Sequence, residues 1–177
     1  MNNINWQILS GAKHTLTFSM IQYVVFVFIQ IIFARILSPE IFGEFAMISI
    51  TVMFFFTLSN FCTDKLIIVD NSLNQSKYSS LVSFDIIYST LIYLIFYLLI
   101  TNHLIPIINY DYINYILLFG LIIFFHPFSR NKSMLEKKLK FFEARFPSAL
   151  ASIFASIVSL YILWKGYTIL ALIIWKL

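Results

Sequence analysis

Charged residues are scarce in this 177-residue sequence. Only 11% of the residues are Asp, Glu, Lys or Arg, whereas 60% are hydrophobic and 19% are aromatic. Soluble domains carry about 25% charged residues, so this composition excludes an ordinary water-soluble fold and indicates an integral membrane protein. The single cysteine, Cys62, excludes an internal disulfide. The four glycines form no phosphate-binding loop.

Five uncharged runs are each close to the roughly 20 residues that a helix needs to cross a bilayer. They span residues 14–34, 45–63, 86–110, 112–129 and 146–164. A sixth run, 166–175, covers ten residues before the chain ends at Leu177. The sequence therefore predicts an all-α, polytopic transmembrane helical bundle with five full spans and the start of a sixth. We expect the chain to be truncated within this sixth span.

A short charged turn separates the first two runs. Ser38 precedes Pro39, and a residue before proline is disfavoured in the helical conformation, so the first helix should end there. Gly43 then lets the second helix pack closely against the first. The two spans are expected to form an antiparallel hairpin.

The distribution of Lys and Arg predicts the orientation, because these residues are enriched in cytoplasmic loops. With a cytoplasmic N-terminus, the outer set is only Arg35 and Lys165. The inner set then has ten members, which are Lys13, Lys65, Lys77, Arg130, Lys132, Lys137, Lys138, Lys140, Arg145 and Lys176. We therefore predict a cytoplasmic N-terminus and a multi-pass protein of the cytoplasmic (inner) membrane.

Six of the twelve basic residues lie in the inner loop 130–145. Its apolar residues recur at helical spacing, and Glu136 and Lys140 are placed for an i, i+4 pair, so the loop is predicted to be one basic amphipathic helix. Anionic lipid headgroups are its expected partner, and nucleic acid is not expected. A loop that merely anchors the topology explains the same pattern equally well.

Two charged residues are candidate substrate contacts. Asp85 directly precedes the third run and is either a carboxylate inside the membrane or, as the boundaries favour, a residue at headgroup level. Arg35 caps the first span, and a guanidinium suits a phosphate or pyrophosphate. An ion pair of Arg35 with Glu40 and Glu44 explains the turn as well, and the spacing favours that structural role.

No metal or cofactor site is predicted. None of the three histidines, His14, His103 and His126, has a neighbour at metal-ligand spacing. No nucleophile and base at a recognisable spacing indicate an enzyme either.

Three blocks of sequence, at residues 34–43, 133–141 and 166–172, together resemble a known family. That family is the Wzx-type polysaccharide flippases of the multidrug/oligosaccharidyl-lipid/polysaccharide exporter superfamily. Residues 34–43 (ARILSPEIFG) are similar to the turn between helices one and two of that family. Residues 133–141 (SMLEKKLKF) resemble its basic loop between helices four and five, and residues 166–172 (GYTILAL) resemble the opening of its sixth helix. The blocks occur in the family's order and at its approximate spacing.

This resemblance implies a non-enzymatic carrier of lipid-linked oligosaccharide. Such a carrier moves undecaprenyl-pyrophosphate-linked oligosaccharide to the outer leaflet for O-antigen, capsular, lipopolysaccharide or other surface polysaccharide, by alternating access between two lobes. Residues 1–177 would form most of the N-terminal lobe, with Arg35 matching the family's arginine in the first turn. Membrane lipids, the substrate, a C-terminal lobe and other polysaccharide-assembly proteins are the implied partners.

Two alternatives stay open at this point. One is a truncated, non-transporting remnant of such a flippase. The other is an integral-membrane polysaccharide polymerase, although the short predicted outer connections leave little room for its polar chemistry.

Overall fold

The computed structural model of the chain describes residues 2–60, 63–70, 74–105 and 110–176. These residues form helices and no strands. The α-helices are α1 (Asn2–Ile36), α2 (Pro39–Ser59), α3 (Thr63–Val69), α4 (Gln75–Thr101), α5 (Ile113–Phe125), α6 (Arg130–Lys137), α7 (Phe141–Trp164) and α8 (Thr168–Lys176). Two 3-10 turns, η1 (Tyr110–Tyr112) and η2 (His126–Ser129), flank α5.

Five segments of the described chain are long and apolar enough to cross a membrane, which confirms the predicted number of spans. They are Gly11–Ile36, Pro39–Ser59, Gln75–Thr101, Ile113–Lys137 and Phe141–Trp164. In each segment, no more than 33% of the residues in its most apolar window are buried inside the protein. Large apolar side chains such as Met20, Ile50 and Phe154 point outward instead. Exposure on this scale suits hydrocarbon and would be strongly unfavourable in water.

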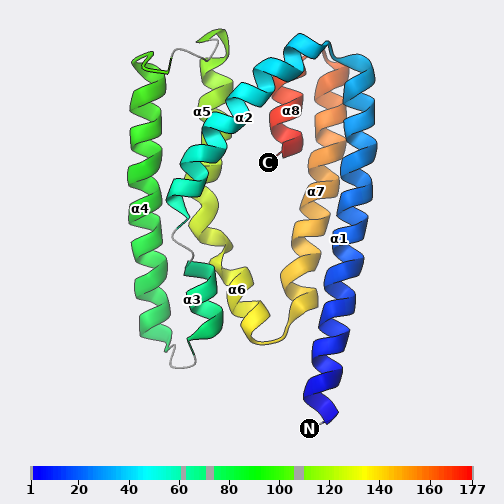
Figure 1. Ribbon diagram of the computed structural model, residues 1–177, viewed down its shortest axis with the longest axis vertical. Helices are drawn as coiled ribbons and strands as arrows, with labels where there is room; N and C mark the ends of the chain where they lie inside the picture. The colour runs from blue at the N-terminus through cyan, green and yellow to red at the C-terminus, as the bar shows by residue number, and fades with distance from the viewer. Residues whose placement is uncertain (1, 61–62, 71–73, 106–109, 177) are drawn as a thin grey trace.

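The helices form two groups that α2 connects (Figure 1). Helix α1 packs along α7, and α4 packs along α5, while α2 crosses obliquely from the top of α1 to reach α4 and α5. Helix α8 packs on α7 and also contacts α2 and α5. The shared core is apolar and includes Phe33, Val52, Phe96, Phe119 and Leu172.

Close packing at one point depends on a glycine. A Cβ atom built on Gly120 of α5 would lie 2.3 Å from the ring of Phe96 on α4. Phe96 is fully buried and packs edge-on against Phe55 of α2, with ring centroids 5.2 Å apart. The absence of a side chain at Gly120 therefore lets α2, α4 and α5 share one core.

Several helix boundaries differ from the prediction. The third span begins at Gln75, eleven residues before the predicted start, so Asp85 lies well inside α4. Helix α2 ends at Ser59, before the end of the second predicted run, and the fourth predicted run is α5 followed by the 3-10 turn η2. Cys62 lies outside the described residues.

The ends of the helices alternate between the two ends of the bundle, as the predicted topology requires (Figure 1). Lys176 is an exception to the predicted inner set. Its ammonium lies 5.7 Å from the ring centre of Phe26, which belongs to the apolar part of α1 and not to its inner end. Nine basic residues of the predicted inner set remain against two in the outer set. The cytoplasmic N-terminus stays a prediction.

Two engineered cysteines test this orientation in a Cys62→Ser background. Asn102 is exposed at the end of α4, and Lys138 is at the opposite end of the bundle, in the turn after α6. We expect Asn102→Cys to react with a membrane-impermeant thiol reagent in intact cells, and Lys138→Cys to react only after the membrane is opened. The reverse pattern would invert the topology.

Candidate functional site

Two spans are interrupted at the same place in the bundle. Helix α2 ends at Ser59 and α3 begins at Thr63, while α5 gives way to the 3-10 turn η2 before α6 begins at Arg130. Pro127 lies in η2 and supplies a local cause, because proline donates no backbone hydrogen bond. The short helices α3 and α6 contact each other. Interrupted helices inside membrane proteins frequently surround polar sites.

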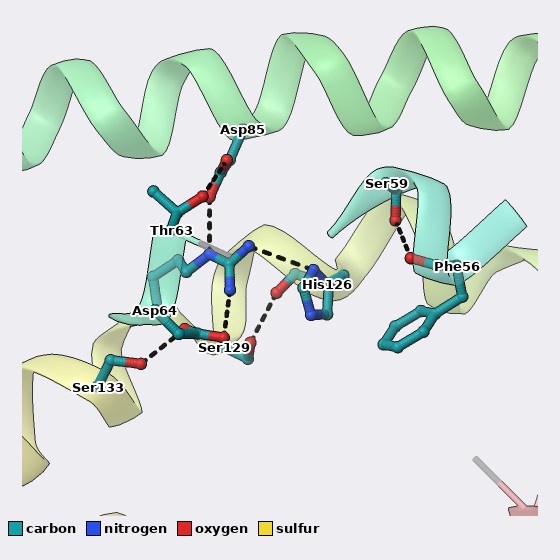
Figure 2. A network of polar contacts seen from close by, with 9 residues as sticks. Phe56, Ser59, Thr63, Asp64, Asp85, His126, Ser129 and Ser133 are labelled. Carbon is teal, nitrogen blue, oxygen red and sulfur yellow. Dashed lines mark hydrogen bonds and ion pairs between the residues drawn. The ribbon is translucent and has the colours of Figure 1, made fainter. Parts of the chain in front are cut away.

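Figure 2 shows polar side chains gathered between these helices, among them Thr63, Asp64 and Asp85. The arginine at the start of α6 bonds to both carboxylates. Arg130 is 1% exposed, and its Nε donates to Oδ2 of Asp85 at 2.7 Å. Its Nη1 lies 2.5 Å from Oδ2 of Asp64. One guanidinium therefore joins α6 to carboxylates on both α4 and α3.

Two hydroxyl groups complete the coordination of the carboxylates. Thr63 donates to Oδ1 of Asp85 at 2.7 Å, and Ser133 donates to Oδ1 of Asp64 at 2.6 Å. Each carboxylate thus has both oxygens engaged by the protein. We call Thr63, Asp64, Asp85, Arg130 and Ser133 the Arg130 cluster. Asp85 is fully buried, so the hydrogen bonds from Thr63 and Arg130 must compensate for the loss of water around its carboxylate.

An imidazole borders the Arg130 cluster. Nδ1 of His126 lies 3.5 Å from Nη2 of Arg130. The His126 ring stands edge-on to Phe56 of α2, with ring centroids 4.7 Å apart. His126 therefore connects the turn η2 to both the guanidinium and the end of α2.

Asp64 lies outside the predicted spans and shows how the cluster tunes a carboxylate. Burial by itself raises the pKa of Asp64, but hydrogen bonds from Ser133 and Arg130 and the charge of Arg130 outweigh it, so the pKa falls below its usual 3.8. The folded state therefore favours the ionised form of Asp64. Its contribution to stability is present above the usual pKa and is lost as the pH falls through the lowered value.

The cluster gives Asp85 a defined structural environment. Asp85 lies inside α4 and is completely buried among protein groups. Its depth in the membrane stays a prediction. The sequence does not single out Asp64 or Arg130 as a site residue, because Arg130 falls at the start of the predicted inner loop. The available signal was Pro127, which interrupts an apolar run just before an arginine.

Arg35 is far less constrained than Asp85. It is exposed near the end of α1, and among the described residues it forms no ion pair with Glu40 or Glu44. The predicted clamp of the hairpin turn is therefore wrong. Burial raises the pKa of the Tyr112 hydroxyl, and Glu44, its hydrogen-bond partner, raises it further, so Glu44 interacts with η1. The Arg35 guanidinium stays accessible.

The basic loop is also organised differently from the prediction. Helix α6 ends at Lys137 and α7 begins at Phe141, so the loop is not one continuous amphipathic helix. Leu139 has a φ of 58° and turns the chain between them. Glu136 pairs with Arg145 at 2.9 Å and not with Lys140. These contacts fasten the start of α7 to α6.

The fold and this site define a multi-pass α-helical membrane protein with a buried ion cluster beside two interrupted helices. A family model described as "Polysaccharide biosynthesis protein" matches residues 32–177. The chain therefore belongs to this family of polysaccharide biosynthesis proteins, which confirms the resemblance found in its sequence. No significant match was found to a curated protein or to a solved structure.

Single substitutions in the Arg130 cluster should destabilise the protein in a definite order. Arg130→Met leaves two carboxylates without their shared cation, and Asp85→Asn removes the fully buried charge partner. Breaking a buried pair from one side costs about 3–5 kcal/mol. Asp64→Asn should cost less, since the Asp64 side chain is 37% exposed and water can replace part of its contacts.

Thermal unfolding of the purified variants in detergent micelles measures this order. Thr51→Val is a suitable control, because the only described hydrogen-bond partner of the Thr51 hydroxyl is the Met47 carbonyl of its own helix. Equal losses for Asp64→Asn and Arg130→Met would contradict the burial argument.

Proposed function

We propose that this protein is part of a flippase that moves undecaprenyl-pyrophosphate-linked oligosaccharide across the cytoplasmic membrane for surface polysaccharide assembly. Membership of the polysaccharide biosynthesis family supports the substrate class. The observation that carries the proposal is the Arg130 cluster, buried within apolar helices. Ionisable residues in such surroundings are costly and are characteristic of transport proteins.

The chemistry of the substrate requires a protein of this kind. The polyprenyl tail can stay in the hydrocarbon, whereas the pyrophosphate and the sugars need a polar path that shields them from it. Interrupted helices such as α2–α3 and α5–α6 let irregular backbone exist at membrane depth where protein surrounds it. We infer that residues 1–177 supply the N-terminal lobe of this path.

The two candidate residues take different roles in this proposal. Asp85 uses both oxygens for Thr63 and Arg130, so it acts as a positioning residue that holds α3 and α6 against α4. A direct contact of Asp85 with substrate would first require the ion pair to open. Arg35 is exposed at the α1–α2 turn and has its donors available for the pyrophosphate.

The contacts of the Arg130 cluster also suit a protein that changes conformation by moving groups of helices as rigid units. The cluster joins three helices through short contacts whose removal is expensive, so α3, α4 and α6 should move as one unit. Rigid units that rotate about their packed neighbours are a common basis of alternating access.

An export assay tests the role of Arg35. In a host that lacks its own flippase and expresses the complete gene, Arg35→Gln should lower the rate of surface glycan appearance by about tenfold, the loss expected for a charge-assisted hydrogen bond. Arg35→Lys should lie between Arg35→Gln and the unaltered protein, because lysine keeps the charge but not the bidentate geometry.

Immunoblots of the membrane fraction must show unchanged abundance for these variants. Glu40→Gln is the matched control, since Glu40 is also exposed at the same turn. Normal export by Arg35→Gln would remove Arg35 from the substrate path. Failure of the unaltered gene to restore any export would contradict the proposed function itself.

A further inference from the structure

The guanidinium of Arg130 has a third partner besides its two carboxylates. Nε and Nη1 of Arg130 bind Asp85 and Asp64, whereas Nη2 lies 3.5 Å from Nδ1 of His126. Histidine is the side chain whose charge ordinarily changes between pH 5 and 8. A titratable ring therefore borders the ion pairs that join α3, α4 and α6, and the proposed function gives it no role.

The contact with Arg130 specifies the protonation state of His126. An arginine donates hydrogen bonds from its N–H groups and accepts none, so Nδ1 of His126 must be the acceptor. An imidazole nitrogen accepts a hydrogen bond only when it carries no proton. In this structure His126 is therefore neutral, with its proton on Nε2.

A proton on Nδ1 would place a second cation against the guanidinium. The hydrogen bond from Nη2 would be lost, and the nearest nitrogen atoms of the two cations would lie 3.5 Å apart. The other charges that act on His126 are Asp64 of α3 and Asp85 of α4. Both carboxylates are already bound by Arg130 and by a hydroxyl group, so neither pairs with an imidazolium unless the Arg130 cluster opens. Repulsion from the guanidinium in direct contact therefore dominates.

The remaining surroundings of His126 hold the ring without adding charge. Phe56 of α2, whose ring centroid lies 4.7 Å away, is uncharged, and α5 contains no Asp, Glu, Lys or Arg. Ser129 donates to the carbonyl oxygen of His126 at 2.7 Å, which fixes the backbone. The His126 side chain is only partly buried, so a proton can reach it without unfolding of the bundle.

We propose that His126 is a pH-sensitive switch on the Arg130 cluster. The neutral imidazole completes the coordination of Arg130 and connects the guanidinium to Phe56 near the end of α2. Uptake of a proton by His126 removes this hydrogen bond and repels the guanidinium, which weakens the hold of the cluster on the interrupted helices. The switch goes beyond the transport function proposed above and does not depend on the identity of the substrate.

The number of protons bound decides the direction of the pH effect. The intact cluster binds no proton at Nδ1 of His126, whereas a histidine of an opened or unfolded chain binds one below its ordinary pKa of about 6.5. Acid therefore favours the opened states, and stability falls as the pH decreases below that value. A single proton changes the folding equilibrium by at most about tenfold for each pH unit.

Nitrogen-15 NMR of the complete protein, labelled at histidine and purified in detergent, tests the protonation state. The signals of His126 are those that disappear in His126→Asn. We expect them to report the neutral ring with the proton on Nε2 at pH 7.5, and still at pH 6.0, where an ordinary histidine is mostly protonated. A charged ring at pH 7.5, or a neutral ring with its proton on Nδ1, would overturn the proposal.

Thermal unfolding of the complete protein between pH 7.5 and 5.5 tests the switch itself. His126→Asn keeps an acceptor oxygen near the place of Nδ1 but takes up no proton in this range. The unaltered protein should lose about 2–4 °C in Tm for each pH unit below 6.5, and His126→Asn should lose much less. His14→Asn is the matched control, because His14 is exposed on α1 and should leave the loss unchanged.

A second readout covers the case in which His126→Asn does not fold. Hydrogen exchange in the unaltered protein, corrected for the pH dependence of the intrinsic rate, should become faster in α3 and α6 at pH 5.5 than at pH 7.5, relative to α1 and α7. Unchanged protection of α3 and α6 would overturn the switch, as would the same pH dependence of Tm in His126→Asn and the unaltered protein. Neither result bears on glycan export, so the proposed function stands or falls separately.

Discussion

The structure depends on one guanidinium that three helices share. Arg130 is almost completely buried, and its only anionic partners among the described residues are Asp64 and Asp85. A buried cation is stable only when its anionic partners are well oriented and their remaining oxygen lone pairs also accept hydrogen bonds. Here the hydroxyl groups of Thr63 and Ser133 donate those hydrogen bonds to the two carboxylates. The contacts compensate for the interruptions between α2 and α3 and between α5 and α6, which an apolar bundle alone would not favour.

The remainder of the bundle follows a different physical rule. Its core consists of apolar and aromatic side chains, and its outer surface is also apolar. The hydrophobic effect therefore does little to decide which apolar side chains lie in the core and which face outward. Shape therefore decides which residues face inward. Gly120 admits Phe96, and Trp175 occupies the space between Phe26 and Phe33.

Hydropathy was sufficient to predict the class of the protein and the number of its spans, because the cost of charge in hydrocarbon is large and local in sequence. The same rule misplaced the third span. It placed the start of the span after Asp85, at Ile86, whereas α4 begins at Gln75 and Asp85 pairs inside the bundle with Arg130, 45 positions further along. A compensating residue so distant in sequence leaves no local signal. The ion pair predicted between Arg35 and Glu44 is wrong for a related reason. Glu44 interacts with Tyr112, which is close in space but distant in sequence.

A double-mutant cycle between Asp85 and Arg130 tests whether their ion pair holds the interrupted helices together. The free energy of unfolding is measured for the unaltered protein, Asp85→Asn, Arg130→Met and the double variant, under one detergent condition. If the pair holds the interrupted helices, the double variant loses less than the two single losses combined, by about 1–3 kcal/mol. Losses that add to within about 0.5 kcal/mol would mean that the two residues stabilise the protein independently, and the account of the cluster would be wrong.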